Sequence, residues 1–242
     1  LRGMRPAVCA CMPAQARLSW FLATTSCITG CSYHAFSPPT RVVPLESPQV
    51  LPQARHSVAA QVIDTGAVWG PSFLGAAVRY RRGLWDKLEG SAEASLLHVT
   101  KQPEDVDIWP QGYSVRGGLK FQPLDWVALG VGVGGGGSAF GGFVSPDIGL
   151  VVGYENPYIV PFIEGRAFIS QPIGARSLYV GQDDGETRYT KPQTTWGLAA
   201  GLGLRVPLQH VEPVGHSLLL GVSLTDVFDR ERREGFLAAS VG

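Results

Sequence analysis

Hydrophobic and polar positions alternate along the stretch from Gly112 to Gly153. Successive residues of a β-strand point to opposite faces of a sheet, so a period of two predicts strands. One face of the first strand carries the large side chains Tyr113, Val115, Leu119 and Phe121. The other face carries Ser114, Arg116, Gly118 and Lys120. The stretch therefore predicts a strand with one large apolar face and one small or charged face.

A return strand with the same asymmetry follows a turn at 122–125. Its large face carries Val127, Leu129, Val131 and Val133, and its small face carries Ala128, Gly130, Gly132 and Gly134. A soluble barrel packs large apolar side chains inside, whereas a membrane barrel turns them to the lipid and keeps polar or small residues inside. Inner glycines leave room for arginine and lysine side chains from neighbouring strands. The pattern predicts an all-β fold, an antiparallel up-and-down transmembrane β-barrel.

The same periodicity predicts about ten strands along the chain. Their ranges are 56–64, 72–82, 88–100, 113–121, 127–134, 147–154, 158–170, 194–206, 216–225 and 236–242. A tilted strand needs about 9–11 residues to cross a bilayer, and most of these ranges are near that length. Eight strands are possible if the first and last ranges are not strands.

The connections between the predicted strands alternate in length. Short turns are expected near 83–87, 122–125 and 155–157, with a somewhat longer one at 207–215. Longer polar or glycine-rich loops are expected near 65–71, 101–110, 134–146, 171–193 and 226–234. Short periplasmic turns and longer external loops are typical of outer-membrane barrels. This alternation predicts that both termini lie on the periplasmic side.

The N-terminal residues differ in composition from the rest of the chain. Residues 1–30 combine arginines with a mostly apolar run and no acidic residue, which predicts a signal peptide. The end of this run, Ile28-Thr29-Gly30-Cys31, resembles the bacterial lipobox, which implies cleavage before Cys31 and acylation of that cysteine. An ordinary signal peptide is the alternative. Residues 31–55 are rich in proline and predict an extended tether, which leaves 56–242 as the barrel domain.

Aromatic side chains gather near the ends of the predicted strands. Amphipathic rings favour the membrane–water interface, so this clustering predicts two aromatic belts. The alternative is that aromatic residues simply favour strands. The belt on the short-turn side is expected to contain Trp85, Phe121, Trp126, Tyr154 and Tyr158. The belt on the loop side is expected to contain Phe140, Phe143, Phe168 and Trp196.

Two predicted turns carry a family resemblance. The segments Phe121-Gln122-Pro123-Leu124-Asp125-Trp126 and Tyr154-Glu155-Asn156-Pro157-Tyr158 resemble periplasmic turns of small bacterial outer-membrane barrels of the OmpA-like and OmpW-like kind. The resemblance implies a non-enzymatic protein of the Gram-negative outer membrane, porin-like or structural. Its partners would be outer-membrane lipid and small solutes. Two features depart from that family: the last residues include no aromatic side chain, and an acylated cysteine is unusual on an integral barrel.

Nine charged residues share the predicted inner face. They are Arg79, Arg81, Glu89, Glu93, Arg116, Lys120, Glu164, Arg166 and Arg205. Charges inside a narrow barrel must be paired or hydrated, because burial of an unpaired charge is costly. A structural ion-pair network that fills the lumen is one interpretation, and a charged pore lining that selects solutes is the other. The narrow lumen expected for ten strands favours the structural network.

Other function classes find little support in the sequence. The formal net charge of zero argues against a nucleic-acid partner. No apolar run reaches eighteen residues, so a membrane-spanning helix is not expected. The glycine run at 130–135 matches a dinucleotide fingerprint only formally, because no helix follows it. The histidines are scattered without metal-ligand spacing, so neither a metal nor a cofactor is expected.

Two alternative functions remain from other classes. His216, Ser217 and Asp226 resemble a hydrolase constellation of lipid-modifying barrels, but adjacent strand residues point to opposite faces. We therefore expect no catalytic residue. The second alternative is a tethered soluble periplasmic barrel that binds an apolar ligand. It requires the face that carries Val127 and Val131 to point inward.

Overall fold

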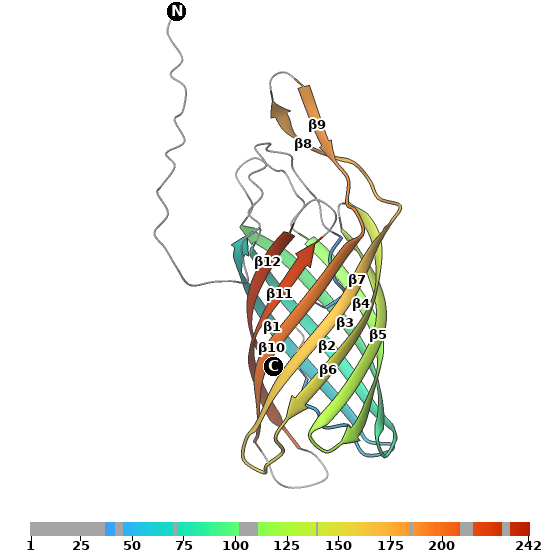
Figure 1. Cartoon of the computed structure of the whole chain (residues 1–242), viewed down its shortest axis with the longest axis vertical. Coiled ribbons are helices and arrows are strands. Elements are labelled where there is room, and N and C mark those ends of the chain that lie inside the picture. Colours follow the sequence, from blue (N-terminus) through green and yellow to red (C-terminus); the bar gives the residue numbers. More distant parts are fainter. Residues whose placement is uncertain are drawn as a thin grey trace, which may run out of the picture. The chain divides into compact units, whose positions relative to one another are not determined.

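The computed structural model describes residues 37–41, 46–69, 72–101, 111–138, 140–183, 186–208, 215–228 and 233–242. These residues form a closed β-barrel of ten antiparallel strands and a separate two-stranded sheet (Figure 1). No helix in the described ranges is long and apolar enough to cross a membrane. The sequence-based prediction of an all-β antiparallel barrel with about ten strands is confirmed.

The strands follow one another around the barrel in chain order. The barrel strands are β1 (His56–Trp69), β2 (Ser72–Trp85), β3 (Leu88–Lys101), β4 (Gln111–Leu124), β5 (Val127–Ser138), β6 (Gly141–Gly153), β7 (Val160–Ile173), β10 (Thr195–Pro207), β11 (Ser217–Phe228) and β12 (Arg233–Val241). The two-stranded sheet consists of β8 (Leu178–Asp183) and β9 (Glu186–Thr190). It lies in the connection between β7 and β10, which pair directly with each other.

Pairing between the first and last strands closes the barrel. β1 pairs with β12 from Val62 opposite Val241 to Trp69 opposite Gly235, with one irregularity near Trp69. Both terminal strands are therefore real, and the eight-strand alternative is wrong. A closed ladder leaves no sheet edge, so every strand has two hydrogen-bonded neighbours.

The predicted glycine-rich loop at 134–146 is wrong. β5 continues to Ser138 and β6 begins at Gly141, so the connection between them is a tight turn. The glycines belong to the strand because its neighbours approach closely. A Cβ on Gly136 would collide with the carbonyl oxygen of Tyr113, and one on Gly135 would lie 2.7 Å from the carbonyl oxygen of Phe143. The longer loop predicted at 65–71 is also wrong, since β1 continues to Trp69 and β2 begins at Ser72. The expected alternation of short and long connections is therefore interrupted at both places.

The two faces of the barrel wall differ as the alternation predicts. Large apolar side chains are exposed on the outer face, with Val131 49% exposed in the middle of β5. Small and polar side chains occupy the inner face, including Ala128, Ser145 and Ser170. Two aromatic side chains expected in the outer belt, Phe143 and Phe168, are instead buried. Their positions alternate with the outer residues of β6 and β7, so strand geometry overrides the preference of rings for an interface.

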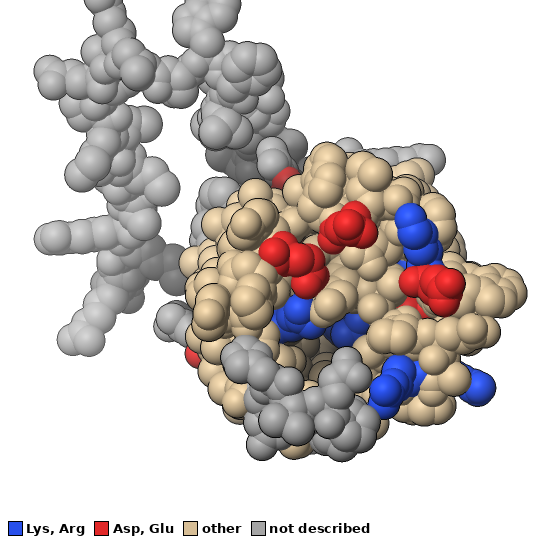
Figure 2. Space-filling model, turned by 90° about the horizontal axis from the view of Figure 1, so that it is seen from below, with Lys and Arg blue, Asp and Glu red and all other residues tan. Residues whose placement is uncertain are grey.

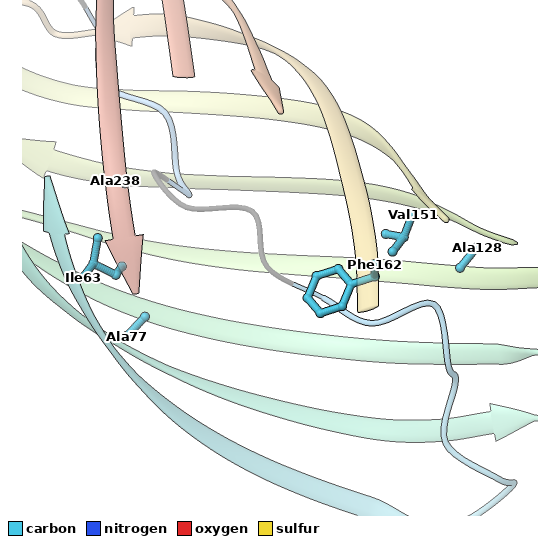
Figure 3. Close-up of a cluster of buried hydrophobic side chains, with 6 residues drawn as sticks. All are labelled: Ile63, Ala77, Ala128, Val151, Phe162 and Ala238. Carbon is cyan, nitrogen blue, oxygen red and sulfur yellow. The ribbon is translucent and has the colours of Figure 1, made fainter. Parts of the chain in front are cut away.

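An apolar cluster forms one layer of the barrel interior (Figure 3). It consists of Ile63, Ala77, Ala128, Val151, Phe162 and Ala238, which come from β1, β2, β5, β6, β7 and β12. Phe162 is the largest of these side chains, and Gly203 on β10 makes room for it: a Cβ there would collide with the ring. The lumen is thus partly filled from its own wall near the short-turn end of β7.

Candidate functional site

The lumen contains part of the chain that precedes β1. We call the described residues 37–41 and 46–51 the lumen segment. Ser37, Thr40, Arg41, Ser47 and Val50 are all buried, although none of them belongs to a helix or strand. The sequence predicts an extended tether here, and its proline content fits the absence of regular structure. The packing of this segment inside the barrel is not predicted.

The first residues of the lumen segment contact the loop end of the barrel. The backbone N–H of Ser37 donates to Thr195 Oγ1 at 2.9 Å, at the first residue of β10. The hydroxyls of Ser37 and Ser170 lie 2.9 Å apart, and Ser170 donates to the Pro38 carbonyl at 2.6 Å. Ser170 lies near the loop end of β7, which ends at Ile173.

The middle of the lumen segment joins a buried charge network. Arg41 donates to both carboxylate oxygens of Glu93, at 3.0 and 2.6 Å, and its remaining terminal nitrogen lies 2.7 Å from Glu46. Arg79 of β2 shares the same two acids, at 2.6 Å from Glu93 and 3.2 Å from Glu46. The backbone N–H of Glu46 donates to Glu164 Oε2 at 2.9 Å. Two arginines therefore share two acids, with one of each kind supplied by the lumen segment.

The last residues of the lumen segment contact the short-turn end. Lys120 donates to the carbonyl oxygens of Ser47 and Gln49 at 3.3 and 2.9 Å. The backbone N–H of Leu51 donates to Glu89 Oε2 at 2.9 Å. Lys120 and Glu89 lie near the turns that join β4 to β5 and β2 to β3.

The chain then leaves the lumen at the β2–β3 turn. The N–H of Ala54 donates to the carbonyl of Gly83, and the N–H of Gly83 donates to the carbonyl of Arg55. A Cβ at Gly83 would collide with the carbonyl oxygen of Pro52, so glycine permits this close approach. Figure 2 shows this end of the barrel, with acidic and basic side chains around and within its hollow.

All nine residues of the predicted inner charge set face the interior, and most are buried. Arg81 and Glu89 form a two-nitrogen pair at 2.6 Å, and Glu164 lies 2.8 Å from Arg166. Arg116 pairs with both oxygens of Asp147 at 2.6 Å. Such bidentate pairing is the strong geometry for a buried guanidinium and carboxylate. Every buried charge of the wall named here thus has a partner of opposite sign.

Four charged residues that pair with the predicted set are absent from the sequence-based set. They are Arg41, Glu46, Asp147 and Glu155. Asp147 could have been found, because it alternates with Ile148 and so shares the inner face of β6. Arg41 and Glu46 lie in a segment without periodicity, so no pattern assigned them to a face.

Small inner residues make space for the arginine side chains. A Cβ at Gly132 would collide with the guanidinium of Arg116, and one at Gly118 would lie 2.7 Å from Arg116 Nη1. Both glycines lie on the strands that flank this side chain, β4 itself and β5. The expectation that inner glycines accommodate long basic side chains is met at this position.

Arg205 differs from the other members of the charge set. It lies 3.4 Å from Glu155, in the connection between β6 and β7, and both side chains are partly exposed. Burial raises the pKa of the Glu155 carboxyl above its ordinary value, and the nearby Arg205 guanidinium opposes that shift. This pair lies at the short-turn end of the barrel and is separate from the deeper network.

The predicted belt residues lie on the outer surface. Trp85, Phe121, Trp126, Tyr154, Tyr158 and Trp196 are all exposed. The first five lie at or near the short turns, and Trp196 lies at the loop end of β10. The structure thus places rings at both ends of the apolar outer face, although Phe143 and Phe168 do not contribute.

The alternative sites are not assembled. His216 and Ser217 lie at the short-turn end of β11, and Asp226 is near its other end. Strand rise separates His216 from Asp226 by about 30 Å, too far for a catalytic contact. The described residues contain no group of histidine, cysteine, aspartate and glutamate side chains that could hold a metal. The predicted lipidation site Cys31 lies outside the described residues.

The apolar-ligand alternative also lacks the interior it needs. Val131 and its neighbours Leu129 and Val133 on the same face are exposed on the outside. The inside is lined by charged and small residues and by the apolar cluster around Phe162, and it holds the lumen segment. Comparison with protein-family models and with curated proteins finds no match for this chain.

Proposed function

We propose that the protein is a non-enzymatic, structural β-barrel of the Gram-negative outer membrane, whose lumen is closed by its own N-terminal segment. The observation that carries this proposal is the inverted distribution of side chains. Charged residues such as Glu89 and Glu164, each 1% exposed, lie inside, while valine, leucine and isoleucine cover the outside.

Lipid is the solvent that suits this distribution. A continuous apolar outer band in water would be a large exposed hydrophobic patch, which soluble monomers rarely tolerate. In a bilayer the same band meets hydrocarbon, and the closed barrel gives every strand a hydrogen-bonded neighbour on each side. Exposed rings at both ends of the band suit the two interfacial regions.

The lumen segment favours a structural role over a porin-like one. The segment contacts the apolar cluster as well as the charge network. Pro48 of the segment lies beside Phe162, since a Cβ at Gly153 would lie 2.9 Å from both Pro48 Cδ and Phe162 Cβ. Its two charged residues pair with the wall instead of facing open water. Passage of a solute would require these contacts to break, so the resting barrel is expected to be closed.

A charge placed on the outer face tests the membrane proposal. Val131→Arg puts a guanidinium in the middle of β5, where a bilayer has its hydrocarbon midplane. The free energy of folding into lipid vesicles is expected to weaken by about 2–4 kcal/mol. Leu124→Arg is the matched control, because Leu124 is equally exposed at 49% but lies at the short-turn end of β4. There the same charge should cost only about 0–1 kcal/mol.

The comparison separates lipid from water as the solvent of the outer face. Urea titrations of the two variants in vesicles, followed by tryptophan fluorescence, measure both costs. Equal, small effects of the two arginines, together with solubility of the wild-type chain without detergent, would rule out the membrane proposal.

A further inference from the structure

The order of contacts along the lumen segment defines its direction. Ser37 contacts Ser170 and Thr195 near the loop ends of β7 and β10. Leu51 contacts Glu89 at the short-turn end of the barrel, near the start of β3. Between them the partners change in the same direction, since the Thr40 carbonyl accepts from Ser114 and Arg41 contacts Glu93 in mid-strand.

This order excludes a hairpin that enters and leaves by the same end. A hairpin would bring the first and last described residues of the segment to the same rim. Ser37 and Leu51 instead contact opposite rims, so the segment crosses the lumen once. β1 then begins at the short-turn end, where His56 pairs with Arg82.

A single crossing fixes the side on which the preceding residues emerge. The barrel wall is closed, and Ser37, the first described residue of the segment, contacts the loop rim. We propose that the barrel carries its own N-terminal segment across the membrane and presents the residues before Ser37 on the loop side. The inference rests on the proposed function, and it replaces the expectation that the N-terminus is periplasmic.

Cysteine labelling on intact Gram-negative cells tests the crossing. The reporter is Ala35→Cys in a chain whose native cysteines, Cys9, Cys11, Cys27 and Cys31, are changed to alanine. Two matched reporters mark the two ends: Ser177→Cys in the β7–β8 connection and Asp86→Cys in the β2–β3 turn, both at exposed positions. The probe is a maleimide that does not cross the outer membrane, applied before and after permeabilisation.

The expected pattern assigns Ala35→Cys to the loop side. It should be labelled on intact cells to the same extent as Ser177→Cys, whereas Asp86→Cys should be labelled only after permeabilisation. Labelling of Ala35→Cys that follows Asp86→Cys, or that is absent in both conditions, would overturn the crossing. If Ser177→Cys and Asp86→Cys do not differ in intact cells, the proposed membrane-spanning barrel itself fails.

Discussion

Glu93 is the residue at which the lumen segment and the wall meet most directly. Its carboxylate accepts from Arg41 of the segment and from Arg79 of β2, at 2.6 Å for each closest contact. A buried pair is stabilising only when all its partners are present, because a charge left alone carries the cost of desolvation. The same residue thus contacts both the barrel wall and the lumen segment.

Removal of this carboxylate charge should be costly. Glu93→Gln leaves two buried guanidinium groups to share the remaining acid, Glu46. The free energy of unfolding in lipid vesicles is expected to fall by about 3–5 kcal/mol, as when one partner of a buried pair is removed. Glu155→Gln is the control, because its pair with Arg205 is partly exposed and should contribute about 0–1 kcal/mol. Equal losses from both substitutions would show that burial does not determine the strength of these pairs.

At this scale the sequence predicts which wall residues face inward, and alternation is the reason. A period of two assigns each strand residue to a face without knowledge of its neighbours. It cannot assign Arg41 or Glu46, whose positions depend on partners far along the chain. The backbone N–H of Glu46 donates to the carboxylate of Glu164, 118 positions along the chain, and no local pattern encodes such a contact.

Local sequence patterns do not predict the position of the lumen segment or the full length of β5. Proline and the lack of periodicity in the segment indicate extended structure, but extended structure serves equally as a tether or as the filling of a lumen. The glycines of 134–138 indicate a loop by composition. In the barrel they are strand residues. Glycine is needed there because the carbonyl oxygens of Tyr113 and Phe143 approach these positions closely. Composition alone gives no access to these distances.

The lumen segment should also be what keeps the barrel closed to ions. A chain that begins at Pro52 lacks the segment but retains all ten barrel strands, whose ladders do not include it. The lumen segment itself contributes one base and one acid, Arg41 and Glu46, so its loss leaves the net charge inside the barrel unchanged. The truncated chain is expected to conduct ions in planar bilayers, whereas the full chain should stay closed.

A control deletion tests whether the closed state depends on the lumen segment specifically. A chain without residues 178–190 loses β8 and β9, which form a sheet of their own outside the barrel ladder. It should stay closed like the full chain. Circular dichroism of the refolded proteins checks that each keeps its strands. A folded truncated chain that does not conduct would show that wall side chains alone close the lumen.

The whole molecule combines a closed ladder with an outer face of exposed valine, leucine and isoleucine side chains. Strand count, strand order and the facing of the wall follow from periodicity and turn signals. Closure is expected from the proposed membrane location, since a strand edge would have no partner in lipid. What periodicity does not give is the content of the lumen, because that depends on the width of the finished barrel and on which segment fits it.

Closure should be visible as resistance to detergent. On a Cys31→Ala background, which removes any contribution of an acyl chain, the unheated protein is expected to migrate differently in SDS gels from the boiled protein. The reason is that a closed ladder has no edge from which strands can separate one at a time. A chain that ends at Phe228 lacks β12 and leaves one edge of β1 and one edge of β11 unpaired, so it should migrate identically with and without heating. A heat-dependent shift in the shortened chain would mean that the pairing of β1 with β12 is not what makes the barrel resistant. No shift in the full chain would mean that the closed ladder does not resist SDS.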